Sequence, residues 1–144
     1  MIINTRHTGL VVKDIAASIY FYEKLGLKLW RREIEVGDFI SQVVGFDNAE
    51  IETAKLKLSD GSLLELLEYK SHPTTPATTI YGSNKHGCSH VAFTVEDIEE
   101  ILLKVIQSGG SIVNPPKISA NGLVKVMYCH DLDGILMEIV EELT

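Results

Sequence analysis

The strongest constraint on the fold of this chain is an internal duplication. Residues 7–15 (HTGLVVKDI) align without a gap with residues 90–98 (HVAFTVEDI), 83 positions later. Residues 60–68 (DGSLLELLE) align with residues 133–141 (DGILMEIVE), 73 positions later. A repeat of this kind predicts two modules with the same order of elements.

The two alignments differ in offset by ten residues, so the first module has about ten more residues between its blocks. We expect them between Val36 and Glu50, because the free-energy cost of closing a loop rises slowly with its length. We assign module one to residues 1–70, a linker to residues 71–87 and module two to residues 88–144. A chain of 144 residues fits a single compact domain built from both modules.

Each module is predicted to contain a strand, a helix and then about three strands, which gives an α+β fold. The runs from His7 to Val12 and from His90 to Val95 are rich in β-branched residues, as strands are. The helix of the second module ends at Gly109 and has an apolar stripe of helical period. The stripe consists of Ile98, Ile101, Leu102, Val105 and Ile106.

Composition argues against several classes of protein. The formal net charge is -7, so we expect no basic surface that neutralises phosphates and no nucleic-acid partner. The apolar runs are far shorter than the roughly 20 residues that cross a bilayer, and no signal segment opens the chain. We therefore expect no membrane association and a cytoplasmic location. Cys88 and Cys129 lack the close spacing of metal ligands and are expected to be free thiols.

The first strand of each module carries a histidine on a face of small residues. Because side chains alternate along a strand, His7 shares its face with Gly9, and His90 shares its face with Ala92 and Thr94. The opposite faces carry bulky apolar residues that suit packing under the helices. The faces with the histidines are therefore expected to border a cavity.

Two glutamates occupy apolar positions of the last strands. Glu65 and Glu138 each lie between two aliphatic residues on their strand face, where an unpaired charge would cost on the order of several kcal/mol. No Lys or Arg lies within either strand, so the compensating cation is a metal ion or a basic side chain that arrives from another segment of the chain. A divalent ion bound by His7, Glu65, His90 and Glu138 would have four protein ligands and open positions for water.

A single strand histidine or strand glutamate is more often a structural residue than a ligand. The recurrence of both residue types at the same positions of the two modules favours a ligand set. Glu68 and Glu141 also recur, near the ends of their strands, and are expected to be solvated. His72, His86 and His130 do not recur and are expected in surface loops.

Taken together, these motifs resemble the vicinal oxygen chelate (glyoxalase-like) superfamily over nearly the whole chain. The resemblance rests on residues 7–12 with Asp14, Phe21-Tyr22, residues 25–27, residues 64–66, residues 90–97, and Asp133-Gly134 leading to Glu138. It implies two tandem βαβββ modules whose strands form an open, cup-shaped mixed or antiparallel sheet, with the helices outside. It also implies one metal ion bound by His7, Glu65, His90 and Glu138.

A set of two His and two Glu resembles the lyase and isomerase branch, which includes glyoxalase I (lactoylglutathione lyase) and methylmalonyl-CoA epimerase. The implied reaction removes a proton α to a metal-chelated carbonyl of a 2-oxo compound, a thioester or a hemithioacetal. Glu138 is implied as the base, with Glu65 as its partner, although the sequence cannot order the two. The implied ion is one of Ni, Co, Zn, Mn and Fe, and a homodimer is expected.

Two alternatives stay open. A non-catalytic binder of small molecules, of the antibiotic-resistance type, can use the same fold, but such proteins often lose the metal ligands. An Fe(II) dioxygenase-like enzyme typically uses two His and one carboxylate. Use of glutathione is not favoured, because Val11 or Val12 and residues 68–70 (EYK) occupy places where glyoxalase I normally has basic and amide side chains.

Overall fold

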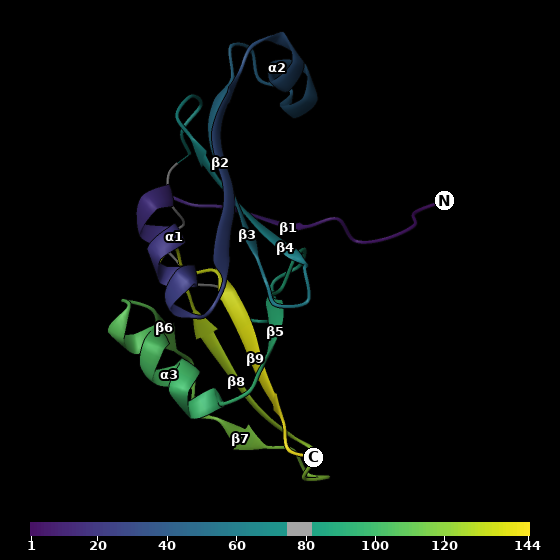
Figure 1. The fold of residues 1–144 in the computed structure, drawn as a ribbon, viewed down its shortest axis with the longest axis vertical. Helices are drawn as coiled ribbons and strands as arrows, with labels where there is room; N and C mark the ends of the chain where they lie inside the picture. The colour runs from purple at the N-terminus through teal and green to yellow at the C-terminus, as the bar shows by residue number, and fades with distance from the viewer. Residues whose placement is uncertain (75–81) are drawn as a thin grey trace. The chain divides into compact units, whose positions relative to one another are not determined.

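The computed structural model describes residues 1–74 and 82–144, so part of the predicted linker lies outside the described residues. The chain divides into two compact units, residues 1–76 and residues 77–144. Each unit is described by itself below, and Figure 1 labels the elements of both.

The first unit is a four-stranded mixed sheet with a helix on one face. Its elements are β1 (Thr8–Val11), α1 (Ile15–Lys24), β2 (Lys28–Val36), α2 (Asp38–Val44), β3 (Glu50–Lys57) and β4 (Leu63–Tyr69). The strand order is β1-β4-β3-β2, with β1 parallel to β4 and the other neighbours antiparallel. Helix α1 lies along the sheet (Figure 1), and its Ile15, Ile19 and Tyr22 are buried with Leu64 and Leu66 of β4.

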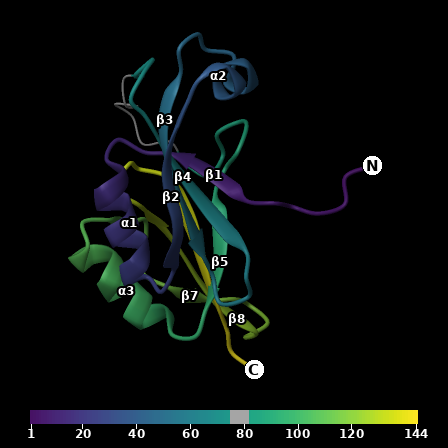
Figure 2. The same cartoon turned by 45° about the horizontal axis from the view of Figure 1, so that its top comes forward.

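The ten additional residues of the first module fall where the offsets place them, but they are not a plain loop. They include the short helix α2, which extends beyond the end of β2 (Figure 2). Gly45 ends this helix with a φ of 76°, a left-handed conformation that glycine adopts without a steric penalty. None of the residues of α2 is buried, so the hydrophobic pattern from which we predicted the longer helices is absent here.

The second unit repeats the plan with an interrupted outer strand. Its elements are β5 (Val91–Val95), α3 (Ile98–Gln107), β6 (Ser111–Ile112), β7 (Lys117–Ile118), β8 (Val124–His130) and β9 (Leu136–Glu142). The strand order is β5-β9-β8-β6, and β7 also pairs with β8. Pro115 and Pro116 lie between β6 and β7; they have no backbone N–H to donate, which accounts for the break.

The duplication extends to the strand register. In the first unit Gly9 of β1 is the partner of Glu65 of β4, and in the second unit Ala92 of β5 is the partner of Glu138 of β9. These are the positions that the two sequence alignments equate. The predicted α+β class, built from two modules of one strand, one helix and further strands, is therefore confirmed.

The helices α1 and α3 begin in the same way. Asp14 and Asp97 are their N-caps: the Asp14 side chain accepts a hydrogen bond from one amide of the first turn, and the Asp97 side chain accepts hydrogen bonds from two. Glu68 and Glu141, expected to be solvated, instead accept hydrogen bonds from the backbone amides at the first position of α1 and α3, both at 2.8 Å. That expectation was wrong because the acceptor comes from a strand more than 40 residues later in the chain.

None of the helices in residues 1–74 and 82–144 combines the length and the apolar character needed to cross a bilayer.

Candidate metal-binding site

The first unit brings His7 and Glu65 together. His7 directly precedes β1. Glu65 lies in the neighbouring strand β4, opposite Gly9, which is two residues after His7. The Nε2 atom of His7 lies 3.7 Å from a carboxylate oxygen of Glu65. The Glu65 side chain is 13% exposed, so the carboxylate is mostly shielded from water.

The second unit brings His90 and Glu138 together at the equivalent positions. The Nε2 atom of His90 lies 3.0 Å from a carboxylate oxygen of Glu138. The other ring nitrogen, Nδ1, lies 3.0 Å from the hydroxyl of Ser89, and the ring makes an edge contact with Tyr128. Such an outer hydrogen bond fixes the orientation of an imidazole, as it does for histidines that bind metals.

The chemistry of these groups fits a divalent ion. In both units Nε2 and a carboxylate oxygen face each other, and these are donor atoms that Zn, Ni, Co, Mn and Fe accept. Nδ1 of His7 is buried without a hydrogen-bond partner among the described residues, so this ring lacks the outer hydrogen bond that the ring of His90 makes with Ser89. Among the described residues, no three His, Cys, Asp or Glu side chains form a group that could hold a metal ion, so each unit presents only one pair of predicted ligands.

A lysine of another strand, which the sequence did not identify, compensates one of the two glutamates. Lys55 of β3 is the direct register partner of Glu65, and its Nζ atom lies 3.5 Å from the carboxylate. For Glu65 the alternative of a basic side chain from another segment therefore holds, and its charge does not by itself require a metal. The signal for Lys55 was antiparallel pairing between β3 and β4, because opposite residues share a face. In the second unit the register partner of Glu138 is Tyr128, which carries no charge.

One further expectation about histidines needs correction. His130 was placed in a surface loop, but it is the last residue of β8 and is buried. Its Nε2 atom has no hydrogen-bond partner among the described residues. His72, in contrast, follows β4 outside the strands, where its ring stacks on Phe46 at 4.9 Å.

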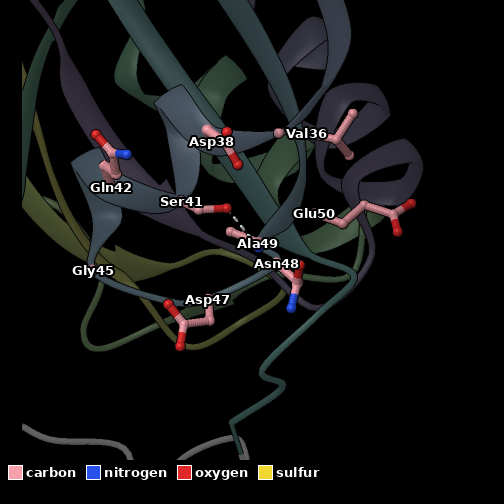
Figure 3. Close-up of a pocket in the computed structure, with 10 residues that line it drawn as sticks. Val36, Asp38, Ser41, Gln42, Gly45, Asp47, Asn48, Ala49 and Glu50 are labelled. Carbon is pink, nitrogen blue, oxygen red and sulfur yellow. Dashed lines mark hydrogen bonds between the residues drawn. The ribbon is translucent and has the colours of Figure 1, made fainter.

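A pocket of about 620 Å³ lies elsewhere in the first unit, around α2 and the turn that follows it. Figure 3 shows Asp38 and Asp47 on its lining and the hydrogen bond from the amide of Ala49 to the hydroxyl of Ser41. Neither His7 nor Glu65 contributes to this lining. The pocket is therefore a surface depression of the α2 segment and not the place where His7 and Glu65 meet.

Comparison with known proteins identifies the family of this chain. The profile of the glyoxalase/bleomycin resistance protein/dioxygenase superfamily matches residues 5–139. The chain belongs to this superfamily. The match spans β1 to most of β9 and includes all four predicted ligands.

Relatives within the superfamily share the length and the fold of this chain. A probable lactoylglutathione lyase of a Synechocystis strain is 28% identical over 141 residues, which cover 94% of this chain and 92% of the relative. A lactoylglutathione lyase of Escherichia coli O157:H7 is 30% identical over 138 residues, with coverage of 94% and 90%. The crystal structure of a glyoxalase family protein from Bacillus cereus superposes with a TM-score of 0.92 at 28% identity, covering 100% of this chain and 97% of that one.

Proposed function

We propose that this protein is a divalent-metal-dependent lyase or isomerase of the glyoxalase type, which removes a proton α to a carbonyl of a small molecule. The observation that carries the proposal is the repeated His–Glu pair, at 3.7 Å in the first unit and 3.0 Å in the second. Relatives of nearly equal length that are named lactoylglutathione lyase support the same reaction class.

The proposed metal ligands are His7, Glu65, His90 and Glu138. Each pair offers only one nitrogen and one carboxylate, and a catalytic metal site usually takes three or four protein ligands. We therefore propose that both pairs act on one ion, taken from Ni, Co, Zn, Mn and Fe. A bound divalent ion would polarise the substrate carbonyl and stabilise the negative charge that develops when the α-proton leaves.

The two glutamates are not equivalent, and we propose Glu138 as the base. Glu65 is held by Lys55 at 3.5 Å, whereas no Lys or Arg of the described residues forms an ion pair with Glu138. The side chain of Glu138 is also more exposed, at 26% against 13%. A carboxylate free of a lysine can move toward the substrate and take a proton, so the asymmetry favours Glu138 for proton transfer.

The test is exchange of the α-proton in D2O, followed by NMR, with hemithioacetals formed from a 2-oxoaldehyde and a thiol. Exchange or product formation that requires the divalent ion and consumes no oxygen supports the proposal. We expect Glu138→Gln to lower the rate by about a hundredfold or more, which is the usual contribution of a general base. Glu142→Gln, at the exposed end of the same strand, is the matched control. Tight binding of these compounds without metal or turnover would instead indicate a binding protein.

A further inference from the structure

We propose that a cation cluster on β2 and β3, consisting of Lys28, Arg31, Lys55 and Lys57 beside Trp30, binds an anionic group of the substrate. This inference rests on the proposed function, since it names the class of substrate for the same site. The anionic group is a carboxylate or a phosphoryl group, carried by the molecule whose carbonyl is bound next to Glu65.

The register places all four cations on one face of the sheet. Lys28 is opposite Lys57 and Arg31 is opposite Lys55 in the antiparallel pair of β2 and β3. Opposite residues share a face, and Lys55 and Lys57 are two positions apart on one strand. The contact of Lys55 with Glu65 identifies this face as the one that carries the predicted metal ligand.

Trp30 lies within the cluster. It occupies the extra position of an irregularity in the pairing of β2 with β3, between Leu29 and Arg31. The Nζ atom of Lys57 lies 4.2 Å from the centre of its ring, and the guanidinium carbon of Arg31 lies 5.0 Å from it. These contacts hold two of the cations at defined positions on an exposed surface, in contrast to freely moving lysines.

This arrangement carries a cost that the fold alone does not explain. Like charges directly opposite each other across strands are destabilising, and here two such pairs are neighbours. Among the described residues no carboxylate forms an ion pair with Lys28, Arg31 or Lys57; only Lys55 has one, in Glu65. An anion bound between the strands would relieve the repulsion, so the cluster has the charge pattern of an anion site.

The cluster is not inherited from the duplication. In the second unit Ser111 is opposite His130 in β6 and β8, at the positions of Lys28 and Lys57. Tyr128 stands at the position of Lys55, and Asn114 at that of Arg31. The second unit therefore has the His–Glu pair without the cations. The chain has a net charge of -7, yet four cations lie together on two strands of the first unit. The cluster therefore distinguishes the first half of the proposed site from the second.

Trp30 also provides the means to test the inference, because it is the only tryptophan of the chain. Its fluorescence is followed while metal-free protein is titrated with inorganic phosphate or with acetate at constant ionic strength, balanced with chloride. We expect a saturable change with at least one of the two anions, and the tighter one identifies the preferred group. Lys57→Met and Arg31→Met should each weaken binding by about threefold to fivefold, the range for one exposed charge. Lys24→Met, which removes a lysine lying over Tyr20 on α1, is the matched control and should change nothing.

A kinetic comparison links the cluster to the reaction. Hemithioacetals formed with mercaptoacetate and with 2-mercaptoethanol differ mainly in a carboxylate. We expect Lys57→Met to raise KM for the first by about threefold to fivefold and to leave KM for the second unchanged. No saturable fluorescence change with either anion, or equal effects of Lys57→Met and Lys24→Met, would overturn the inference. The titration needs neither metal nor turnover, so its failure would leave the proposed reaction untouched. If the protein binds the anion but does not exchange the α-proton, that result counts against the proposed reaction alone.

Discussion

The carboxylate of Glu141 accepts a hydrogen bond at 2.8 Å from the backbone amide of Ile98, 43 residues earlier in the chain. It thereby satisfies one of the amides that every helix leaves free in its first turn. The same bond joins Glu68 to Ile15 in the first unit, also at 2.8 Å. In both units the strand that carries a predicted metal ligand is thus tied to the start of the helix on the same sheet.

Loss of this bond should destabilise the protein. We expect Glu141→Ala to lower the free energy of unfolding by about 1 to 2 kcal/mol, because a partly buried amide at a helix start loses its acceptor and the helix dipole loses a favourable charge. Denaturant unfolding followed by circular dichroism measures this change. Glu142→Ala, at the next and exposed position, should change it by less than about 0.5 kcal/mol. Equal effects of the two variants would show that the hydrogen bond contributes nothing.

Removal of Lys55 should destabilise the metal-free protein more than the metal-bound protein. Lys55→Met leaves the shielded carboxylate of Glu65 without its cation, so we expect the metal-free protein to lose about 1 kcal/mol. A divalent ion restores a cation there, so the rise in Tm on adding metal should be larger in the variant than in the wild type. The comparison is a pair of thermal melts with and without metal. A smaller rise in the variant would mean that Lys55 does not compete with the ion for Glu65.

The two thiols should differ in reactivity. Cys88 is exposed, whereas Cys129 is buried in β8, and burial raises the pKa of its thiol to about 12. Because the thiolate is the reactive form, only Cys88 should react with a disulfide reagent at pH 8 in the folded protein. Mass spectrometry should find one modified cysteine before unfolding and two after it, and Cys88→Ser should abolish the first reaction. Rapid modification of Cys129 in the folded protein would contradict this account.

Most of the order of helices and strands was predictable because the sequence contains the same pattern in both halves. The strands around His7 and His90, the helix stripe from Ile98 and the ends of both long helices follow from local periodicity and from glycine. The equivalence of Glu65 and Glu138 could be seen by aligning the two halves of the sequence, and the strand registers of the two units agree with it. A repeated pattern is informative since two independent halves must satisfy the same packing.

The features that could not be predicted depend on contacts between distant segments. Lys55 meets Glu65 only through the register of β3 and β4, and Glu68 meets Ile15 only after the sheet has formed. The helix α2 buries none of its residues, so it leaves no hydrophobic period. His130 was expected in a surface loop because it has no counterpart in the first module, although it ends a strand.

The central claim is that the two His–Glu pairs act together on one divalent ion. The most direct test is the metal content of the dialysed protein by mass spectrometry, combined with calorimetric titration of the metal-free form. We predict one tightly bound ion per chain, and a loss of affinity of at least about a hundredfold in Glu65→Gln and in Glu138→Gln alike. Two independent ions per chain, or no binding in the wild type, would contradict the account.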